Sequence, residues 1–405
     1  MGNIFKTLFI LVFTTALLGC KEKKQTTEIT ALKVSDTLKW SERMMLSEME
    51  RNPEAWSLDF VEKPKWEYTH GLILLACQRL NAQYPNPKYD AYVKAWYNQM
   101  IDDSAHVKTY KQSVYNIDRV KPGNALIGLY NETKNEKYLK VIHLLREQLS
   151  GQPRTSEGGF WHKKVYPYQM WLDGLYMGEP FYAQYTNEFD SGESAQKAYD
   201  DIVLQFDLIQ KHSKDSVTGL LYHGWDESKE QAWANKETGT SPHFWGRAMG
   251  WYMMALVDVL DYFPKEHPGY QRLVEYLNEE SEVLLKYRDQ GLWYQVLDQG
   301  GEEGNYLEAS ASSMFVYAFA KGANKGYLPE EFKNIANDSF QAMIKQFVTV
   351  DGDGIVSLNQ VCGVAGLGGN PYRDGSYEYY VNELIRSNDP KGVGPFIMAA
   401  LELDK

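Results

Sequence analysis

The chain has 405 residues, of which 43% are hydrophobic and 24% charged, so it can bury a large core as one big architecture or as two to three ordinary domains. Its formal net charge of −12 argues against a nucleic-acid partner, because phosphates require clustered lysine and arginine side chains. The 29 tyrosines and 11 tryptophans favour a flat ligand such as a sugar, although aromatic side chains also fill cores.

The first residues are typical of an export signal. Lys6 is followed by an apolar run from Leu8 to Leu18 that is too short to span a bilayer, and Gly19-Cys20 then leads into charged residues. Residues 1–20 resemble a bacterial lipoprotein signal with its lipobox. The resemblance implies that Cys20 is acylated and anchors the protein to a membrane of the bacterial cell envelope, at the outer-membrane surface or the periplasmic face.

Residues 21–30 are polar and are interpreted as a linker, and residues 31–405 as one catalytic domain. After Cys20 the chain has only Cys77 and Cys362, each in a largely apolar or glycine-rich setting. Two cysteines in so large an exported chain do not make a disulfide framework. Both are therefore expected to be buried free thiols.

Helical patterns follow one another along the rest of the chain. Helices are predicted at 31–51, 66–80, 89–102, 122–132, 136–149, 169–187, 194–212, 244–263, 269–287, 308–324, 329–347 and 394–403. No long strand-like alternation competes with them. About twelve helices without an interdomain linker predict an all-α fold in which six helical hairpins form a closed toroid, an (α/α)6 barrel.

One carboxylate in the stretch from Tyr166 to Tyr185 stands out because its neighbours are apolar. Asp173 is flanked by Trp171, Leu172 and Leu175, which remove hydration and disfavour the ionised form, as a general acid requires. The alternative is that Asp173 caps a helix or bonds a neighbouring backbone amide.

Several common chemistries have no motif in this chain. The sequence contains no His-Glu-x-x-His, no Walker loop and no Gly-x-Ser-x-Gly elbow. The run at 351–354, Asp-Gly-Asp-Gly, lacks the carboxylates that a calcium loop needs at its first and last positions. A turn between two short strands is the prediction for this run.

Six sequence blocks occur in the order found in one enzyme family. Three read Trp-Leu-Asp-Gly-Leu-Tyr-Met at 171–177, Leu-Tyr-His-Gly-Trp-Asp at 221–226 and Phe-Trp-Gly-Arg-Ala-Met-Gly-Trp at 244–251. The others lie at 308–315, 360–368 and 388–396. Together these blocks resemble the unsaturated rhamnogalacturonyl hydrolases, glycoside hydrolase family 105, from about Ala31 to the end of the chain.

The resemblance implies an (α/α)6 barrel that removes a 4,5-unsaturated uronic acid from the non-reducing end of an oligosaccharide produced by a polysaccharide lyase. In this family an acid protonates C4 of the C4=C5 bond, water adds at C5, and the hemiketal opens and expels the sugar. One positioned acid and one ordered water suffice, so no metal or other cofactor is expected.

The resemblance also assigns the catalytic pair. Asp173 matches the family's general acid and water activator, and Asp118 matches its second pocket carboxylate. An ionised neighbour would further disfavour ionisation of Asp173, so that the two could divide the roles of acid and charge. For Asp118 a helix N-cap ahead of Pro122 is an equally open interpretation.

Further residues are expected to bind the substrate. His223 resembles the pocket histidine that would bond substrate hydroxyls or the attacking water, although a lone histidine is usually structural. Trp245 and Arg247 lie at the predicted start of a helix, where exposed N–H groups and a guanidinium favour an anion such as a uronate. Trp251, Trp171 and Tyr68 are either the aromatic wall of the pocket or core residues.

Two other functions remain open at this stage. One is an unsaturated glucuronyl hydrolase acting on glycosaminoglycan fragments, and the other is a surface glycan-binding lipoprotein without turnover. Within the favoured family, fragments of rhamnogalacturonan are preferred slightly over fragments of sulfated ulvan. A sulfate would need additional basic residues, for which the candidates are Lys163, Lys164, Arg373 and Lys391.

Overall fold

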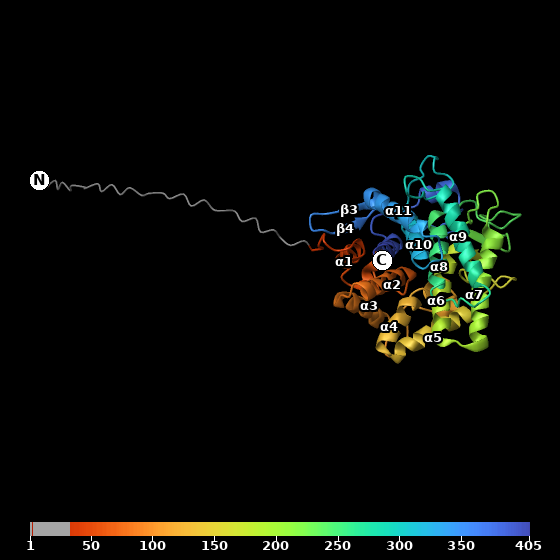
Figure 1. The fold of residues 1–405 in the computed structure, drawn as a ribbon. Coiled ribbons are helices and arrows are strands. Elements are labelled where there is room, and N and C mark those ends of the chain that lie inside the picture. Colours follow the sequence, from red (N-terminus) through yellow and green to blue (C-terminus); the bar gives the residue numbers. More distant parts are fainter. Residues whose placement is uncertain (1, 3–32) are drawn as a thin grey trace. The chain divides into compact units, whose positions relative to one another are not determined.

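In the computed structural model, which describes Gly2 and residues 33–405, six helices rich in buried side chains form a closed ring (Figure 1). They are α2 (Tyr68–Gln83), α4 (Gly123–Thr133), α6 (Leu172–Phe189), α8 (Gly246–Val259), α10 (Ala309–Asn324) and α13 (Pro390–Leu403). Each packs against the next in this order, and α13 packs against α2, which closes the ring.

An outer helix covers each inner one. The outer helices α3 (Pro87–Met100), α5 (Glu136–Ser150), α7 (Gly192–Ser213), α9 (Tyr270–Lys286) and α11 (Glu331–Phe347) follow their inner partners in the chain, and α1 (Trp40–Arg51) covers α13. Their apolar residues occupy one face, as in α9, where Leu273, Leu277 and Leu284 are buried. The predicted all-α (α/α)6 barrel is therefore confirmed.

The twelve predicted helices are all present in the described residues, but several of their ends differ, including that of α8, which stops at Val259 and not at residue 263. The first helix begins at Trp40, not at residue 31, and 169–171 is a strand. The last helix begins at Pro390, four residues earlier than predicted, because proline fits the first helical turn and the Asp389 side chain caps it. The short helix α12 (Tyr377–Val381) and the 3-10 helices η1 (Ala55–Phe60), η2 (Gln112–Val114) and η3 (Ile117–Val120) were not predicted.

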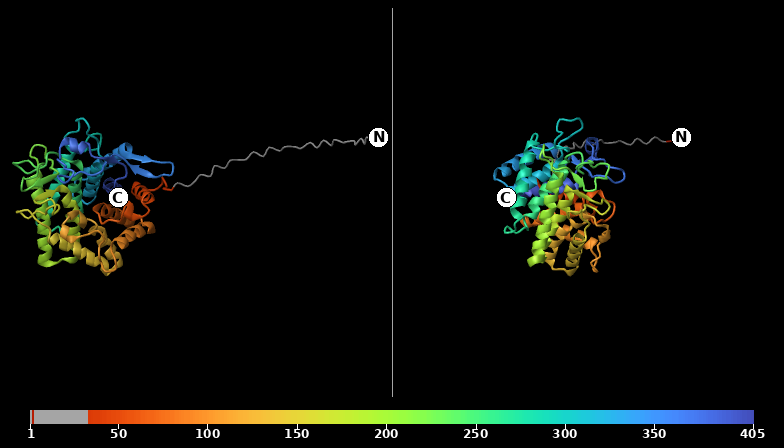
Figure 2. Two further views of the ribbon diagram at one scale, coloured as in Figure 1. Left: turned by 180° about the vertical axis from the view of Figure 1, so that it is seen from behind. Right: turned by 90° about the vertical axis from the view of Figure 1, so that its right-hand side faces the viewer.

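Three short antiparallel strand pairs lie between the helices. They are β1 (Gln169–Trp171) with β2 (Gly224–Asp226), β3 (Val348–Val350) with β4 (Val356–Leu358), and β5 (Val361–Cys362) with β6 (Ile385–Arg386). The predicted turn at 351–354 joins β3 to β4, and Figure 2 shows this hairpin beside α1. Asp351 Oδ1 accepts hydrogen bonds from the backbone N–H groups of Asp353 and Ile355, which explains the turn without a metal ion.

The N-terminal ends of the inner helices meet at one end of the ring. Residues in the first turns of α2, α6, α8 and α13, namely Tyr68, Asp173, Arg247 and Lys391, line the same cavity. The positive ends of four helix dipoles therefore point toward one site, which favours a negatively charged ligand there.

The opposite end of the ring holds a buried group of charges. Lys321 Nζ lies 2.6 Å from Asp258 Oδ1 and also pairs with Asp261, while Arg79 Nη2 lies 3.1 Å from Asp258 Oδ2. These residues come from α2, the end of α8 and α10, so the ion pairs join three inner helices. Lys121 is also fully buried, with its Nζ 3.5 Å from the centre of the Tyr176 ring.

The two cysteines that are described, Cys77 and Cys362, are buried free thiols, as predicted. Burial raises the pKa of Cys362 to about 11.

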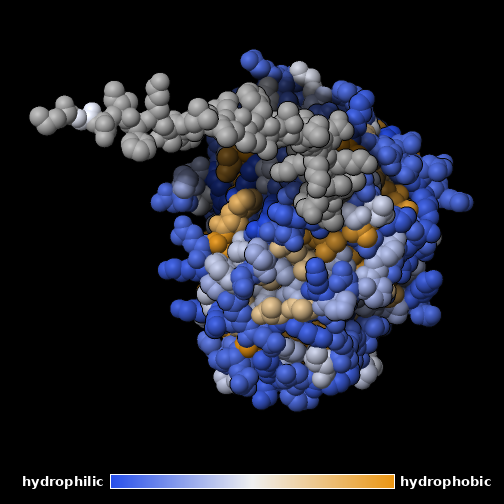
Figure 3. Space-filling model, turned by 90° about the vertical axis from the view of Figure 1, so that its left-hand side faces the viewer, coloured by the Kyte–Doolittle hydropathy of each residue, from blue (hydrophilic) through white to orange (hydrophobic). Residues whose placement is uncertain are grey.

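Cys20 and the signal lie outside the described residues. Of the described helices, none has the length and apolar character needed to cross a membrane. The face in Figure 3 is largely hydrophilic, with small apolar patches.

Candidate active site

A cavity of about 100 Å³ lies at the end of the ring where the helix N-termini meet. Its lining includes seven of the eight residues that the sequence assigned to catalysis or substrate binding: Tyr68, Asp118, Trp171, Asp173, Trp245, Arg247 and Trp251. The eighth, His223, lies behind Asp173 and is fully buried. These residues are far apart in the chain, and the closure of the ring brings them together.

Asp173 is the second residue of α6, and its side chain is 13% exposed to the cavity side. It does not cap the helix, because Trp171 is the N-cap residue and no side-chain cap is formed there. Its Oδ2 atom lies 3.2 Å from His223 Nε2. A carboxyl group in the first turn of a helix also lies in the favourable field of the helix dipole.

The β1–β2 pair places His223 next to Asp173. Trp171 is opposite Gly224 in this pair, and the N–H group of Leu172 donates to the carbonyl of His223 at 3.1 Å. A Cβ atom at Gly224 would lie 2.7 Å from Leu367 Cδ1 and 3.0 Å from Trp171 Cδ1, so any other residue would displace these side chains. His223 Nδ1 lies 2.8 Å from the Tyr380 hydroxyl, which holds the ring in place.

Asp118 lies in η3 and faces two basic side chains. Its Oδ2 atom is 2.6 Å from Lys163 Nζ, and its Oδ1 atom is 3.3 Å from His162 Nε2. The helix-cap interpretation is wrong, because the Asn116 side chain caps η3 and α4 follows Pro122 without a side-chain cap. Burial raises the pKa of Asp118, but the nearby Lys163 ammonium outweighs burial, and the pKa lies below its usual value.

His162 is a site residue that the sequence analysis did not identify. Burial lowers the pKa of His162 to about 4, despite the opposing effect of Asp118. The imidazole is therefore neutral near neutral pH, and its Nε2 atom faces the ionised Asp118 carboxylate at 3.3 Å. No sequence motif pointed to His162, because its partner Asp118 precedes it by more than forty residues.

The aromatic side chains form both the wall of the cavity and part of the core. Trp171 is stacked between His162, at a centroid distance of 4.6 Å, and Tyr166, at 5.1 Å. Trp251 stacks on Tyr176 at 5.0 Å and meets Tyr68 edge-on at 6.4 Å. The two interpretations that the sequence left open for these residues therefore both apply.

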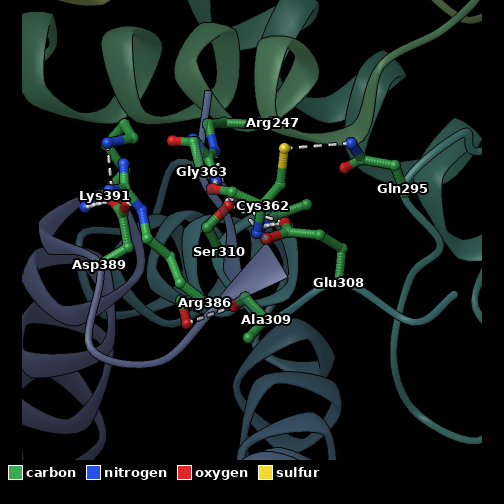
Figure 4. A network of polar contacts seen from close by, with 12 residues as sticks. Arg247, Gln295, Glu308, Ala309, Ser310, Cys362, Gly363, Arg386, Asp389 and Lys391 are labelled. Carbon is green, nitrogen blue, oxygen red and sulfur yellow. Dashed lines mark hydrogen bonds and ion pairs between the residues drawn. The ribbon is translucent and has the colours of Figure 1, made fainter. Parts of the chain in front are cut away.

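Arg247 has a different environment from the one expected. Its guanidinium donates to Ser310 Oγ at 2.7 Å, to the Gly363 carbonyl at 3.2 Å and to the Cys362 carbonyl, and it pairs with Glu308 at 3.6 Å (Figure 4). It thus fixes the segment after β5 to α8 and α10 while also lining the cavity. Trp245, the N-cap residue of α8, donates from Nε1 to Gln295 Oε1 at 3.1 Å.

Lys391 and Arg373 also line the cavity, in addition to the predicted residues. Lys391 Nζ lies 2.7 Å from Asp389 Oδ1 and 3.4 Å from Asp59 Oδ1, and Arg386 pairs with the other Asp389 oxygen at 2.8 Å (Figure 4). Arg373 donates to the Tyr166 hydroxyl at 2.9 Å and to the carbonyls of Leu367 and Gly368. Both were noted in the sequence only as candidate sulfate ligands.

The site has the groups that acid-catalysed addition of water to a sugar requires. Asp173 is a carboxyl group beside a buried histidine, Asp118 is held ionised by Lys163, and the surrounding aromatic faces suit a sugar ring. Within residues 33–405 no group of three or more histidine, cysteine, aspartate or glutamate side chains is arranged to hold a metal ion.

Comparison with known proteins gives consistent matches. The family model described as Glycosyl Hydrolase Family 88 matches residues 40–405. The chain is similar to a solved family 105 glycoside hydrolase of C. acetobutylicum, with 45% identity, a TM-score of 0.86, and coverage of 91% of this chain and 99% of that one.

Two curated proteins are also similar. Protein Atu3128 of Agrobacterium fabrum is 38% identical over 232 residues, which make up 56% of this chain and 97% of that protein. The unsaturated rhamnogalacturonyl hydrolase YesR of Bacillus subtilis is 26% identical over 255 residues, which make up 61% of this chain and 68% of that protein.

Proposed function

The chain belongs to Glycosyl Hydrolase Family 88, and we propose that it removes a 4,5-unsaturated uronic acid from the non-reducing end of rhamnose-linked oligosaccharides produced by polysaccharide lyases. The 45% identity to a solved family 105 enzyme confirms the resemblance that the sequence blocks carry. The chain is a glycoside hydrolase of the unsaturated uronyl hydrolase kind.

One observation carries the proposal: two carboxyl groups with different partners line one aromatic cavity. Asp118 is held ionised beside Lys163, whereas Asp173 has only the buried His223 ring at 3.2 Å. Pairs of carboxyl groups in contrasting environments are typical of sites in which one group transfers a proton and the other supplies a fixed charge. We assign the acid to Asp173 and the charge to Asp118.

The proposed reaction balances with one water molecule. Asp173 gives its proton to C4, positive charge develops at C5 and the ring oxygen, and water adds to C5 while returning a proton to Asp173. The bond between C5 and the ring oxygen of this hemiketal then breaks to give a ketone. The hemiacetal left at C1 releases the remaining oligosaccharide as an alcohol. The ionised Asp118 stabilises the positive charge that forms during protonation.

The charges around the cavity support a uronate as the ligand. Lys163, Arg247, Arg373 and Lys391 all line it, together with the N-terminal turns of four helices. Lys163 faces Asp118, Lys391 faces Asp389 and Arg247 faces Glu308, so their charges are partly offset. Arg373 donates to the Tyr166 hydroxyl and to backbone carbonyls, which carry no charge, so its positive charge is left to meet the substrate carboxylate.

The partners of the basic side chains also bear on whether rhamnogalacturonan or ulvan is the source of the substrate. Lys163 and Lys391 already face carboxylates, Arg373 is the cation left for the uronate itself, and the exposed Lys164 lies over the Tyr115 ring at 5.5 Å. A sulfated rhamnose would need a second cationic site that is not already neutralised. We therefore rank unsulfated rhamnogalacturonan fragments above ulvan fragments. Comparing kcat/KM on the two oligosaccharides tests this order, and a tenfold preference for the sulfated one would reverse it.

The assay for the activity uses the absorbance of the substrate itself. Purified protein is incubated with lyase-generated oligosaccharides, and the ultraviolet absorbance of the C=C bond is followed with time. Loss of absorbance on rhamnose-linked substrates is the expected result. Turnover only of glycosaminoglycan fragments would identify an unsaturated glucuronyl hydrolase. Saturable binding without loss of absorbance would instead identify a glycan-binding lipoprotein.

We also propose that Cys20 carries a lipid anchor and places the enzyme at the bacterial cell envelope. The support is the sequence alone, in which an apolar run ends in Gly19-Cys20. Cys20→Ser is expected to move the protein from the membrane fraction to the soluble fraction. An unchanged distribution between the two fractions would refute the anchor.

A further inference from the structure

A small internal cavity lies behind the catalytic site, between α6, α7 and the loop that carries His162. Its volume is about 10 Å³, which is about the space that one water molecule requires. Most of its wall is apolar, including Phe160 and Leu175. Its polar lining groups are His162, Glu179 and Gln205.

Two of these three polar groups carry an unsatisfied atom at the cavity. His162 Nδ1 and Glu179 Oε2 are both buried, and neither has a hydrogen-bond partner among the described residues. Gln205, in contrast, is satisfied, because its Oε1 accepts from the Phe160 N–H at 2.7 Å and its Nε2 donates to the Gly158 carbonyl at 3.2 Å. Two unpaired buried polar atoms facing one water-sized cavity are the setting in which an internal water is bound.

The protonation states of the two groups are complementary. Burial raises the pKa of Glu179 well above its usual value, helped by Asp201 and opposed by Arg154 and Arg146, so the side chain is a neutral acid and a donor. The groups facing His162 are Asp118, Lys163, Asp173 and His223. His162 Nε2 lies 3.3 Å from the ionised Asp118 Oδ1, so a proton on Nε2 faces a negative oxygen and leaves Nδ1 as the accepting nitrogen.

The sequence of α6 leaves this path open. Gly174 packs directly against the imidazole, and a Cβ atom there would lie 3.1 Å from His162 Nδ1. The bare glycine therefore keeps the accepting nitrogen in contact with the cavity. Glu179 lies on the same helix, six residues after Asp173, so one element carries both the proposed acid and the group behind the neighbouring histidine.

We propose that Glu179 is a positioning residue: its carboxylic acid donates to a buried water, which donates to His162 Nδ1 and fixes the tautomer that donates from Nε2 to Asp118. The hydrogen-bond chain runs from Glu179 through the water and His162 to the cavity. These hydrogen bonds do not depend on the reaction, whereas their effect on catalysis rests on the proposed function.

Two substitutions separate the hydrogen-bonding role from a packing role. Glu179→Gln keeps the shape and a donor group, and Glu179→Leu keeps the approximate volume but removes the donor. Leu175→Met is the matched control, because it alters the same cavity wall with a volume-conserving apolar change. All three are compared with the unmodified protein by thermal unfolding.

The direct measurement is the tautomer of His162 by ¹⁵N NMR of histidine-labelled protein, with the signal assigned through His162→Gln. An unprotonated Nδ1 is expected in the wild type, in Glu179→Gln and in Leu175→Met, and a mixture of tautomers in Glu179→Leu. A high-resolution crystal structure should place a water within hydrogen-bond distance of both His162 Nδ1 and Glu179 Oε2. A protonated Nδ1 in the wild type, or a dry cavity, would overturn the proposal.

The activity measurement is the pH dependence of kcat/KM on the unsaturated substrate. Loss of the Nε2 bond to Asp118 weakens the stabilisation of the carboxylate, so Glu179→Leu should shift the acid limb to higher pH and lower kcat/KM about tenfold at neutral pH. Glu179→Gln should keep the wild-type profile, and equal profiles for the two variants would overturn the role of Glu179 in positioning.

If the wild-type protein has no activity, the proposed function fails, but the NMR result still shows whether the hydrogen bonds from Glu179 to His162 exist. If Glu179→Leu does not fold, the wild-type spectrum, the crystal structure and Glu179→Gln decide the proposal.

Discussion

Single residues at this site have properties set by neighbours that are distant in sequence. The apolar flanking residues singled out Asp173 but left a helix cap as the alternative, and the resemblance of the sequence blocks pointed to its catalytic role and to the aromatic residues of the pocket. The partners of Asp118 could not, since Lys163 lies 45 residues later and meets it only in the folded ring. Likewise, no pattern in the sequence predicted that the Arg247 guanidinium would bond backbone carbonyls.

Asp173→Asn tests the proposed acid. The amide keeps the shape of the side chain but cannot deliver a proton to C4, so kcat/KM should fall by at least about a hundredfold, with normal folding. The assay is the loss of C=C absorbance, with folding checked by circular dichroism. Asp103→Asn is the control, because Asp103 is fully exposed in the loop after α3. Retained activity in Asp173→Asn would remove the assignment.

Lys163→Met tests the electrostatic setting of Asp118. The wild-type pKa of Asp118 lies below its usual value, so the carboxylate is ionised until the pH falls through that low value. Removing the Lys163 ammonium raises the pKa, so the acid limb of the kcat/KM profile should shift to higher pH. The stability contributed by ionised Asp118 should also be lost at higher pH than in the wild type.

Lys164→Met is the matched control for this variant. Lys164 is adjacent in sequence and equally charged, but it is exposed and lies over Tyr115 instead of pairing with Asp118. Its pH profile should match the wild type within experimental error. A similar shift in both variants would attribute the effect to overall charge and contradict the role of the Lys163 pair.

At the scale of elements, apolar patterns predicted the helices, because outer helices such as α9 bury one face and inner helices such as α8 are buried along their whole length. The apolar pattern did not predict the structure where pairing with a distant strand determines it. Residues 169–171 continue an apolar pattern into α6, but they pair with 224–226 as strands, and this pairing brings His223 to Asp173. A three-residue strand has too few positions to give a periodic signal.

Arg247→Lys tests how α8 holds the segment after β5. Lysine keeps the positive charge but lacks the planar fork that donates to Ser310 and to the carbonyls of Cys362 and Gly363. The free energy of unfolding should fall by about 3 kcal/mol, because buried acceptors lose their donor and each unsatisfied buried group costs about 1–3 kcal/mol. Amide hydrogen exchange should increase at residues 361–365.

The control for this element is Arg272→Lys on the outer helix α9. Arg272 is half exposed and pairs with Asp207, so the same chemical change should alter stability by less than about 1 kcal/mol. Activity should remain at the wild-type level in Arg272→Lys and fall in Arg247→Lys. Equal unfolding midpoints for the two variants would show that the carbonyl bonds add little to stability.

At the scale of the whole molecule, the ring buries charges that no single helix pattern reveals. Lys121 follows Asp118 closely in the chain, yet its ammonium is influenced by Asp258 of α8 and by Arg79 and Lys321. Burial lowers the pKa of Lys121 to about 7, with Arg79 and Lys321 adding to the effect. The number of helices predicted the barrel, whereas this internal charge arrangement depends on how the helices are packed.

Lys121→Met tests the resulting pH dependence of stability. Between pH 7 and the usual lysine pKa the unfolded chain binds more protons than the native one, so the contribution of Lys121 to stability rises with pH and is lost as pH falls toward 7. From pH 7 to pH 9 the wild type should gain about 2 kcal/mol from this group. Lys121→Met should lack this gain in denaturant unfolding, whereas the exposed Lys140→Met should retain it.

The closure of the ring by α1 and α13 has a consequence for biosynthesis. Among the described helices, α13, which contacts both α10 and α2, comes after all the others in the chain, and its outer cover α1 comes before them. Until α13 is synthesised, the apolar sides of α2 and α10 that it covers remain exposed to water. A nascent chain can therefore form pairs of helices but cannot complete its hydrophobic core. A chain whose α13 has not yet been synthesised is therefore still incompletely folded, which is the state that an export machinery for unfolded chains requires.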